Sequence, residues 1–158
     1  MTYVVEVDED GVRTPLSRRR VAEIARAVLR AETVGDARLS ISFVSNRRIA
    51  ALNRRHLGHR GVTDVISFVL PTPTGLVGDI YVAPEVARRN AAEHGASLRE
   101  ELTRLVVHGV LHVLGFDHPN GSGRVSSPMW RRQEQIVDSL VRRANGRSRR
   151  SRNARSVA

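Results

Sequence analysis

Three histidines in the second half of the chain have the spacing of a metal site. His108 and His112 stand four residues apart, and His118 follows six residues later, after Gly115. On an α-helix, residues four apart lie on one face, so the first two imidazoles can converge on one ion. Glycine readily adopts the left-handed conformation that ends a helix and reverses the chain. The pattern therefore predicts a helix that carries two ligands and a turn at Gly115 that returns the third.

The type and number of these ligands indicate the metal and its chemistry. The chain contains no cysteine, so histidine and carboxylate are its available metal donors. A zinc ion held by three imidazole nitrogens keeps one tetrahedral position open for water, and the pKa of that water falls to about 7. We therefore expect one Zn²⁺ per chain at a hydrolytic site.

A zinc peptidase is one alternative for this spacing. In the peptidases that share it, a glutamate follows the first histidine and acts as general base. Here that position is Gly109, which has no side chain to carry a proton to the leaving amine. The sequence therefore argues against peptide hydrolysis.

The length favours one domain, and the composition is strongly basic. The 158 residues suffice for a single domain, expected over residues 1–144. No apolar stretch is long enough to span a membrane, and the first residues do not resemble a signal peptide, so we expect a cytoplasmic protein. The formal net charge is +10, and all 26 basic residues are arginines, whose planar forks can hold phosphate.

The end of the chain differs in composition from the rest. Residues 145–158 contain five arginines and no acidic residue. Because this tail has no apolar periodicity, we expect it to be disordered. It either raises the affinity for nucleic acid or is a solvated extension that the activity does not need.

Hydrophobic periodicity, caps and turn residues predict a single α+β domain with a roughly four-stranded sheet and about five helices. The capping box Ser97-Leu-Arg-Glu100 opens the helix that carries the first two histidines. The predicted strands cover residues 3–7, 39–44, 63–70 and 77–82, and the predicted helices cover residues 18–32, 46–57, 84–95, 98–114 and about sixteen residues from 128.

The motifs resemble those of the YbeY family, bacterial rRNA maturation factors and zinc-dependent endoribonucleases. The run from His108 to His118 is similar to the family signature His-Gly-x-Leu-His-Leu-x-Gly-Tyr-Asp-His. Residues 63–68, Thr-Asp-Val-Ile-Ser-Phe, and residues 78–80, Gly-Asp-Ile, resemble two strands of the family. The blocks agree in order and spacing over roughly residues 39–141.

The resemblance implies a zincin-like metal helix at residues 98–114, with His108, His112 and His118 as zinc ligands. It also implies a single-stranded RNA substrate, with the 16S rRNA precursor and the small ribosomal subunit as partners in 3′-end maturation and ribosome quality control. The family usually carries an arginine where this chain has Leu57. A further alternative is an RNA- or ribosome-binding factor that zinc stabilises but that cuts nothing.

Two residues are candidates for catalysis beside the metal. Arg60 precedes a strand expected to border the site, where an arginine can neutralise the charge that builds on a phosphodiester under attack; the alternative is a solvated loop arginine. Asp117 can fix the tautomer of a ligand imidazole or simply cap the turn. Asp64 and Asp79 can serve as proton acceptors or hydrogen-bond to nearby loops.

Overall fold

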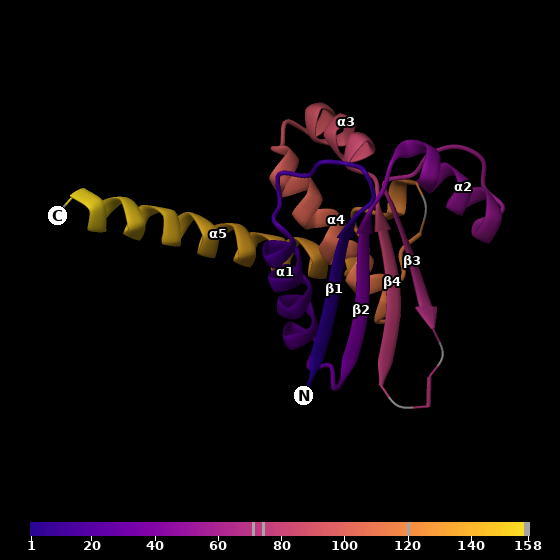
Figure 1. Cartoon of the computed structure of the whole chain (residues 1–158), viewed down its shortest axis with the longest axis horizontal. Helices are drawn as coiled ribbons and strands as arrows, with labels where there is room; N and C mark the ends of the chain where they lie inside the picture. Colours follow the sequence, from indigo (N-terminus) through magenta and orange to yellow (C-terminus); the bar gives the residue numbers. More distant parts are fainter. Residues whose placement is uncertain (71, 74, 120, 157–158) are drawn as a thin grey trace.

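The computed structural model describes the chain from residue 1 to residue 158 except residues 71, 74, 120, 157 and 158 (Figure 1). The described residues form β1 (Tyr3–Glu9), α1 (Arg18–Ala31), β2 (Ala37–Phe43), α2 (Asn46–Leu57), β3 (Val65–Leu70), β4 (Leu76–Val82), α3 (Pro84–His94), α4 (Leu98–Val113), the 3₁₀ turn η1 (Gly121–Gly123) and α5 (Pro128–Ser156). The predicted α+β domain with a four-stranded sheet is confirmed.

The sheet has the strand order β1-β2-β4-β3. β1, β2 and β4 are parallel, and the edge strand β3 is antiparallel to β4. Parallel neighbours need a crossover connection, which α1 supplies between β1 and β2. Helices α1, α4 and α5 contribute to the main core on one face of the sheet, whereas α2 packs beside Ile66 on the other. The sheet therefore supports α4, the helix that carries two of the three histidines.

Two glycines let α4 lie close to the sheet. A Cβ atom at Gly109 would lie 2.7 Å from Cγ2 of Ile80, and one at Gly78 would lie 2.5 Å from Cγ1 of Val113. The Ser67 hydroxyl of β3 also donates a hydrogen bond of 3.0 Å to the Gly109 carbonyl. Position 109 therefore faces the sheet, and a glutamate there, as in the zinc peptidases, would collide with β4.

Replacing Gly109 by alanine should lower the free energy of unfolding by about 1–3 kcal/mol, because the added methyl overpacks the contact between α4 and the sheet. Chemical denaturation of the purified variant measures this change. The matched control is Gly146→Ala on α5, since a Cβ atom there meets nothing within 4 Å. A Gly109→Ala protein as stable as its parent would contradict the close packing.

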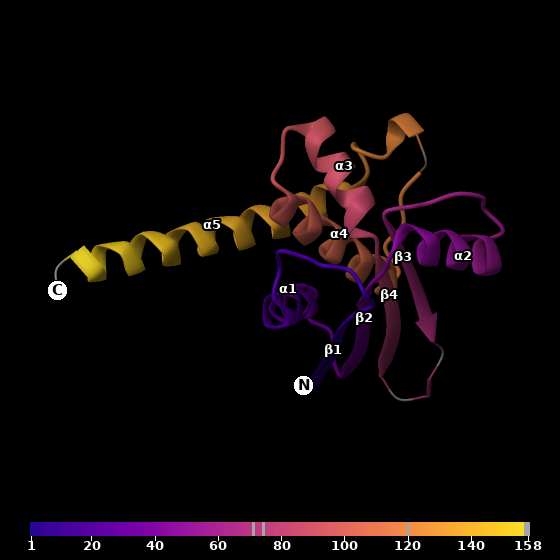
Figure 2. The same cartoon turned by 45° about the horizontal axis from the view of Figure 1, so that its top comes forward.

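The last helix is longer than the sequence predicts. It begins at Pro128 as expected, but it continues to Ser156, whereas a disordered tail was expected from residue 145. Its first half is buried through Met129, Gln133 and Leu140, and residues 142–155 are exposed. Figures 1 and 2 show this second half leaving the domain as a lone helix. The packing of its first half already nucleates α5, and arginine and alanine extend a nucleated helix at little cost in free energy. The composition of residues 145–156 does not show this effect, because it depends on the packed residues that precede them.

None of the helices in the described ranges is long and apolar enough to cross a membrane.

Candidate metal centre

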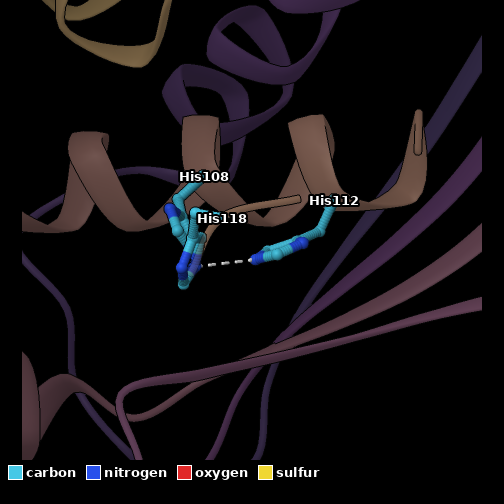
Figure 3. Close-up of side chains that lie close together, drawn as sticks. All are labelled: His108, His112 and His118. Atoms are coloured by element: carbon cyan, nitrogen blue, oxygen red, sulfur yellow. Dashed lines mark hydrogen bonds between the residues drawn. The ribbon is translucent and has the colours of Figure 1, made fainter. Parts of the chain in front are cut away.

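The three histidines meet below the C-terminal half of α4. Figure 3 shows His108 and His112 projecting from the helix on the same side, with His118 returning to them from the following loop. The ligand atoms of all three lie within 4.8 Å of one another, and His112 Nε2 and His118 Nε2 are 3.3 Å apart. The ring centroids are 4.6–5.1 Å apart. The structure thus brings together the three residues that the spacing singled out.

The turn after α4 explains how His118 reaches the other two. Gly115 has a φ of +96°, in the left-handed region that favours glycine. Its N–H donates to the carbonyl of His112, and the N–H of Phe116 donates to the carbonyl of Leu111, each at 3.0 Å. This pair of hydrogen bonds is a Schellman motif, which ends the helix and reverses the chain.

The second ring nitrogens of His108 and His118 have partners that fix the tautomer. His108 Nδ1 donates to Oε1 of Gln133 at 2.6 Å, and His118 Nδ1 donates to the carbonyl of Pro119 at 3.1 Å. His112 has a backbone hydrogen bond with Phe116. A histidine that donates through one nitrogen keeps a lone pair on the other. The chain therefore prepares ring nitrogens as metal ligands before any ion binds.

The geometry and the donor types fit zinc. Two ligands of a tetrahedral zinc ion with bonds of about 2.0–2.1 Å stand about 3.3–3.4 Å apart, which matches the separation of 3.3 Å between His112 Nε2 and His118 Nε2. Imidazole suits zinc, whereas magnesium and calcium prefer oxygen. Among the described residues, the cluster contains three histidines and no fourth protein ligand. A bound ion would keep a position open to solvent.

Burial keeps two of the imidazoles neutral. It lowers the pKa of His108 from 6.5 to about 4, although the hydrogen bond with Gln133 opposes the shift, and it also lowers the pKa of His112. The nearby charges of Arg124 and of the other imidazoles act in the same direction as burial. Neutral imidazole is the form that binds a metal, so this pair is ready to ligate at neutral pH.

The metal-free protein should therefore lose about 2 kcal/mol of stability between pH 7 and pH 5. Below pH 6.5, the unfolded chain takes up a proton at His108 that the folded chain resists until about pH 4. This contribution is complete above pH 6.5 and is lost as the pH falls towards 4. Urea denaturation in the presence of a chelator measures it, and His108→Asn, which removes the titrating group, is the control. Equal pH dependence in both proteins would contradict the assignment.

Gln133 is a site residue that the sequence analysis missed. It is 1% exposed, and its Nε2 donates to Glu134 Oε1 at 3.2 Å. Glu134 in turn accepts a hydrogen bond of 2.7 Å from Arg104 Nε, and this contact is the main reason that the pKa of Arg104 is raised further above its usual range. A glutamine within the apolar stripe of the last helix was the available signal, because buried polar groups need partners.

The predicted carboxylates lie in three different settings. Asp117 accepts a hydrogen bond of 2.8 Å from the backbone N–H of His118 and so holds the turn. Asp64 lines a cavity together with His108 and accepts hydrogen bonds from Val65 N and from the side chain of Asn90. Asp79 lies on the face of the sheet opposite α4, because its neighbours along β4 contact that helix and side chains alternate along a strand.

Arg60 lies in a different hollow from the histidines. It is exposed and, with Arg47 and Arg54, lines a depression beside α2. The cavity that contains His108 is lined instead by residues of α3, α4, α5 and the loops before β3 and α5. The structure therefore groups Arg60 with the basic surface of α2.

Comparisons with known proteins agree with these features. The family model for "Endoribonuclease YbeY" matches residues 6–141. The protein of that name from Frankia alni is 37% identical over 145 residues, which cover 81% of this chain and 79% of that protein. The one from Sulfurihydrogenibium sp. is 33% identical over 139 residues, with coverages of 85% and 91%.

One solved structure shares the fold. The solution structure of TM1509 from Thermotoga maritima superposes with a TM-score of 0.60 at 25% identity and covers 91% of this chain and 93% of that one. The family match ends at residue 141, next to the exposed half of α5.

Proposed function

This chain belongs to the YbeY endoribonuclease family, and we propose that it cuts single-stranded RNA with a zinc ion held by His108, His112 and His118. The observation that carries the proposal is the convergence of three ring nitrogens with no fourth protein ligand in the described cluster. The resemblance of the signature motif supports the finer proposal of 16S rRNA 3′-end maturation and quality control on the small ribosomal subunit, in the cytoplasm.

The residues of this chain have distinct parts in the proposed reaction. When bound, zinc supplies a Lewis acid and lowers the pKa of a water molecule that can attack a phosphodiester. Gln133 and the Pro119 carbonyl orient two of the ligand rings, and burial keeps His108 neutral. Asp117 holds the turn that returns His118, and Arg60 contributes to RNA binding from the basic surface of α2.

Metal analysis combined with RNA cleavage tests this function. The purified protein should hold one zinc ion per chain and should cut a single-stranded RNA but not the same sequence in a duplex. Removing the metal with a chelator should stop cleavage, and adding back one equivalent of zinc should restore it. Full activity in rigorously metal-free protein would refute the proposed zinc dependence.

The exposed half of α5 should add RNA affinity that depends on salt. Residues 142–155 carry seven arginines and no acidic residue, and all of them are exposed. Each arginine that contacts a phosphate of a single strand changes the slope of log K against log salt by about 0.7. Truncation after Ala144 removes five of these arginines and should lower the magnitude of the slope by about 2–3 if three or four of them bind.

Fluorescence anisotropy of a labelled RNA over a range of NaCl concentrations measures this slope. The matched control keeps the full length and replaces the same five arginines by glutamine; it should behave like the truncated protein. A slope that neither variant changes would show that this helix is a solvated extension.

A further inference from the structure

A cavity of about 480 Å³ adjoins the histidine cluster. His108 and Arg124 both line it, together with Asp64, Asn90 and Trp130. Its volume lies within the range of about 300–1,000 Å³ that is usual for ligand sites. It is therefore a place where part of a substrate could lie against the proposed metal.

The backbone and the aromatic neighbour of Arg124 hold it in place. Its N–H donates to the Gly121 carbonyl at 3.2 Å, and its own carbonyl accepts a hydrogen bond of 2.7 Å from the Ser127 hydroxyl. The guanidinium carbon lies 5.9 Å from the ring centroid of Trp130, within the range of a cation–π contact. None of these contacts uses a guanidinium N–H.

The guanidinium of Arg124 lacks the partners that satisfy the other arginine of this cavity. Its Nε is buried and has no hydrogen-bond acceptor among the described residues, and no ion pair to it is found in that part of the chain. Arg104, in contrast, is paired with Glu100, Glu101 and Glu134. A buried N–H without an acceptor costs free energy unless a ligand supplies one.

Arg124 and His108 line the same cavity, so a phosphate bound there can contact the guanidinium beside the histidine cluster. An arginine fork can hold a phosphate through two parallel hydrogen bonds. The cavity therefore places His108, one of the three proposed metal ligands, beside an arginine that has no ion pair among the described residues.

We propose that Arg124 binds a phosphate group of the RNA strand at the mouth of this cavity and thereby positions the strand against the histidine cluster. The inference rests on the proposed function and assigns the phosphate contact to the loop between His118 and α5. The negative phosphate supplies the acceptor that the buried Nε lacks.

Arg124→Gln should weaken binding of a 2′-O-methylated single-stranded RNA by roughly 10- to 100-fold, the loss expected for a charged hydrogen-bonded contact. Anisotropy measures the affinity, and a gel before and after the titration checks that the strand is intact. Arg124→Lys keeps the charge without the planar fork, so its RNA affinity should lie between those of the wild-type protein and Arg124→Gln. The matched control is Arg18→Gln, since Arg18 is exposed on α1 and lines none of the described cavities.

The zinc affinity of the same variants separates a phosphate contact from structural damage. Removing a positive charge near the imidazoles should tighten zinc binding several-fold by competition titration. Damage to the site would instead weaken the binding of zinc and RNA together, and that result would overturn the inference.

A set of strands that each carry one neutral methylphosphonate linkage locates the contact. The RNA affinity of the wild-type protein should fall most when one particular linkage is neutral. The affinity of Arg124→Gln should be the same whether or not that linkage is neutral. Two results would overturn this inference without affecting the proposed function, provided that the wild-type protein binds and cuts single-stranded RNA. One is an RNA affinity of Arg124→Gln equal to that of Arg18→Gln. The other is a loss of affinity at the sensitive methylphosphonate linkage that is as large for Arg124→Gln as for the wild-type protein. If the wild-type protein neither binds nor cuts RNA, the proposed function fails and this assignment fails with it.

Discussion

His112→Ala should abolish RNA cleavage while the protein remains folded and still binds RNA. Two imidazoles remain after the change, and they cannot hold zinc with the geometry that three provide. The loss should exceed the roughly 10- to 100-fold that follows removal of a hydrogen-bond partner of a metal ligand. Single-turnover cleavage of a labelled single strand, measured beside zinc content, gives the result.

The matched control for this variant is His59→Ala. His59 is exposed in the loop after α2 and is not part of the histidine cluster. It should keep full zinc content and activity, whereas His112→Ala should lose both. Retained cleavage by His112→Ala would contradict the enzyme account. Wild-type protein that holds zinc and binds RNA but never cuts it would favour the non-catalytic binding factor.

Gln133→Leu should reduce zinc affinity and kcat/KM by about 10- to 100-fold. Oε1 of Gln133 accepts a hydrogen bond of 2.6 Å from His108 Nδ1, and leucine of similar size cannot accept one. The His108 ring then loses the contact that fixes its tautomer, and Glu134 loses a donor. Zinc titration and steady-state kinetics measure the two effects.

Gln135→Leu on the same helix is the control for this substitution. Gln135 is exposed and is not among the residues that line the cavity beside His108. It should leave zinc affinity and kcat/KM unchanged. Equal behaviour of the two leucine variants would show that the hydrogen bond to His108 does not orient the ligand.

The sequence predicted the parts of the site that depend on local structure. The helix, the turn at Gly115 and the return of His118 all lie within about twenty residues, where caps and periodicity determine the backbone. The element boundaries agree to within about two residues except in α5. At the start of β3, the Asp64 side chain accepts a hydrogen bond from Val65 N, and the strand begins there rather than at Thr63.

The contacts between distant segments could not be predicted in the same way. Gln133 meets His108 across 25 residues of sequence, and that contact depends on how α5 crosses α4. The same holds for Arg124, which shares a cavity with His108, whereas Arg60 lies beside α2. Spacing along a chain contains no information on such packing.

The role of Gly109 also became clear only in three dimensions. The sequence shows that no catalytic glutamate stands at this position. The structure adds that Gly109 packs closely against Ile80 and Ser67, which leaves no room for a larger side chain. The residue is therefore a packing requirement of α4 on the sheet, which is a stronger argument against a peptidase than the missing side chain alone.

A crystal structure of the zinc-loaded protein, with the metal located by anomalous diffraction at the zinc edge, tests the central claim most directly. We expect one zinc ion bound by ring nitrogens of His108, His112 and His118 at about 2.0–2.1 Å, with a solvent molecule as the fourth ligand. Zinc bound elsewhere, or a fourth protein side chain that closes its coordination, would contradict the account.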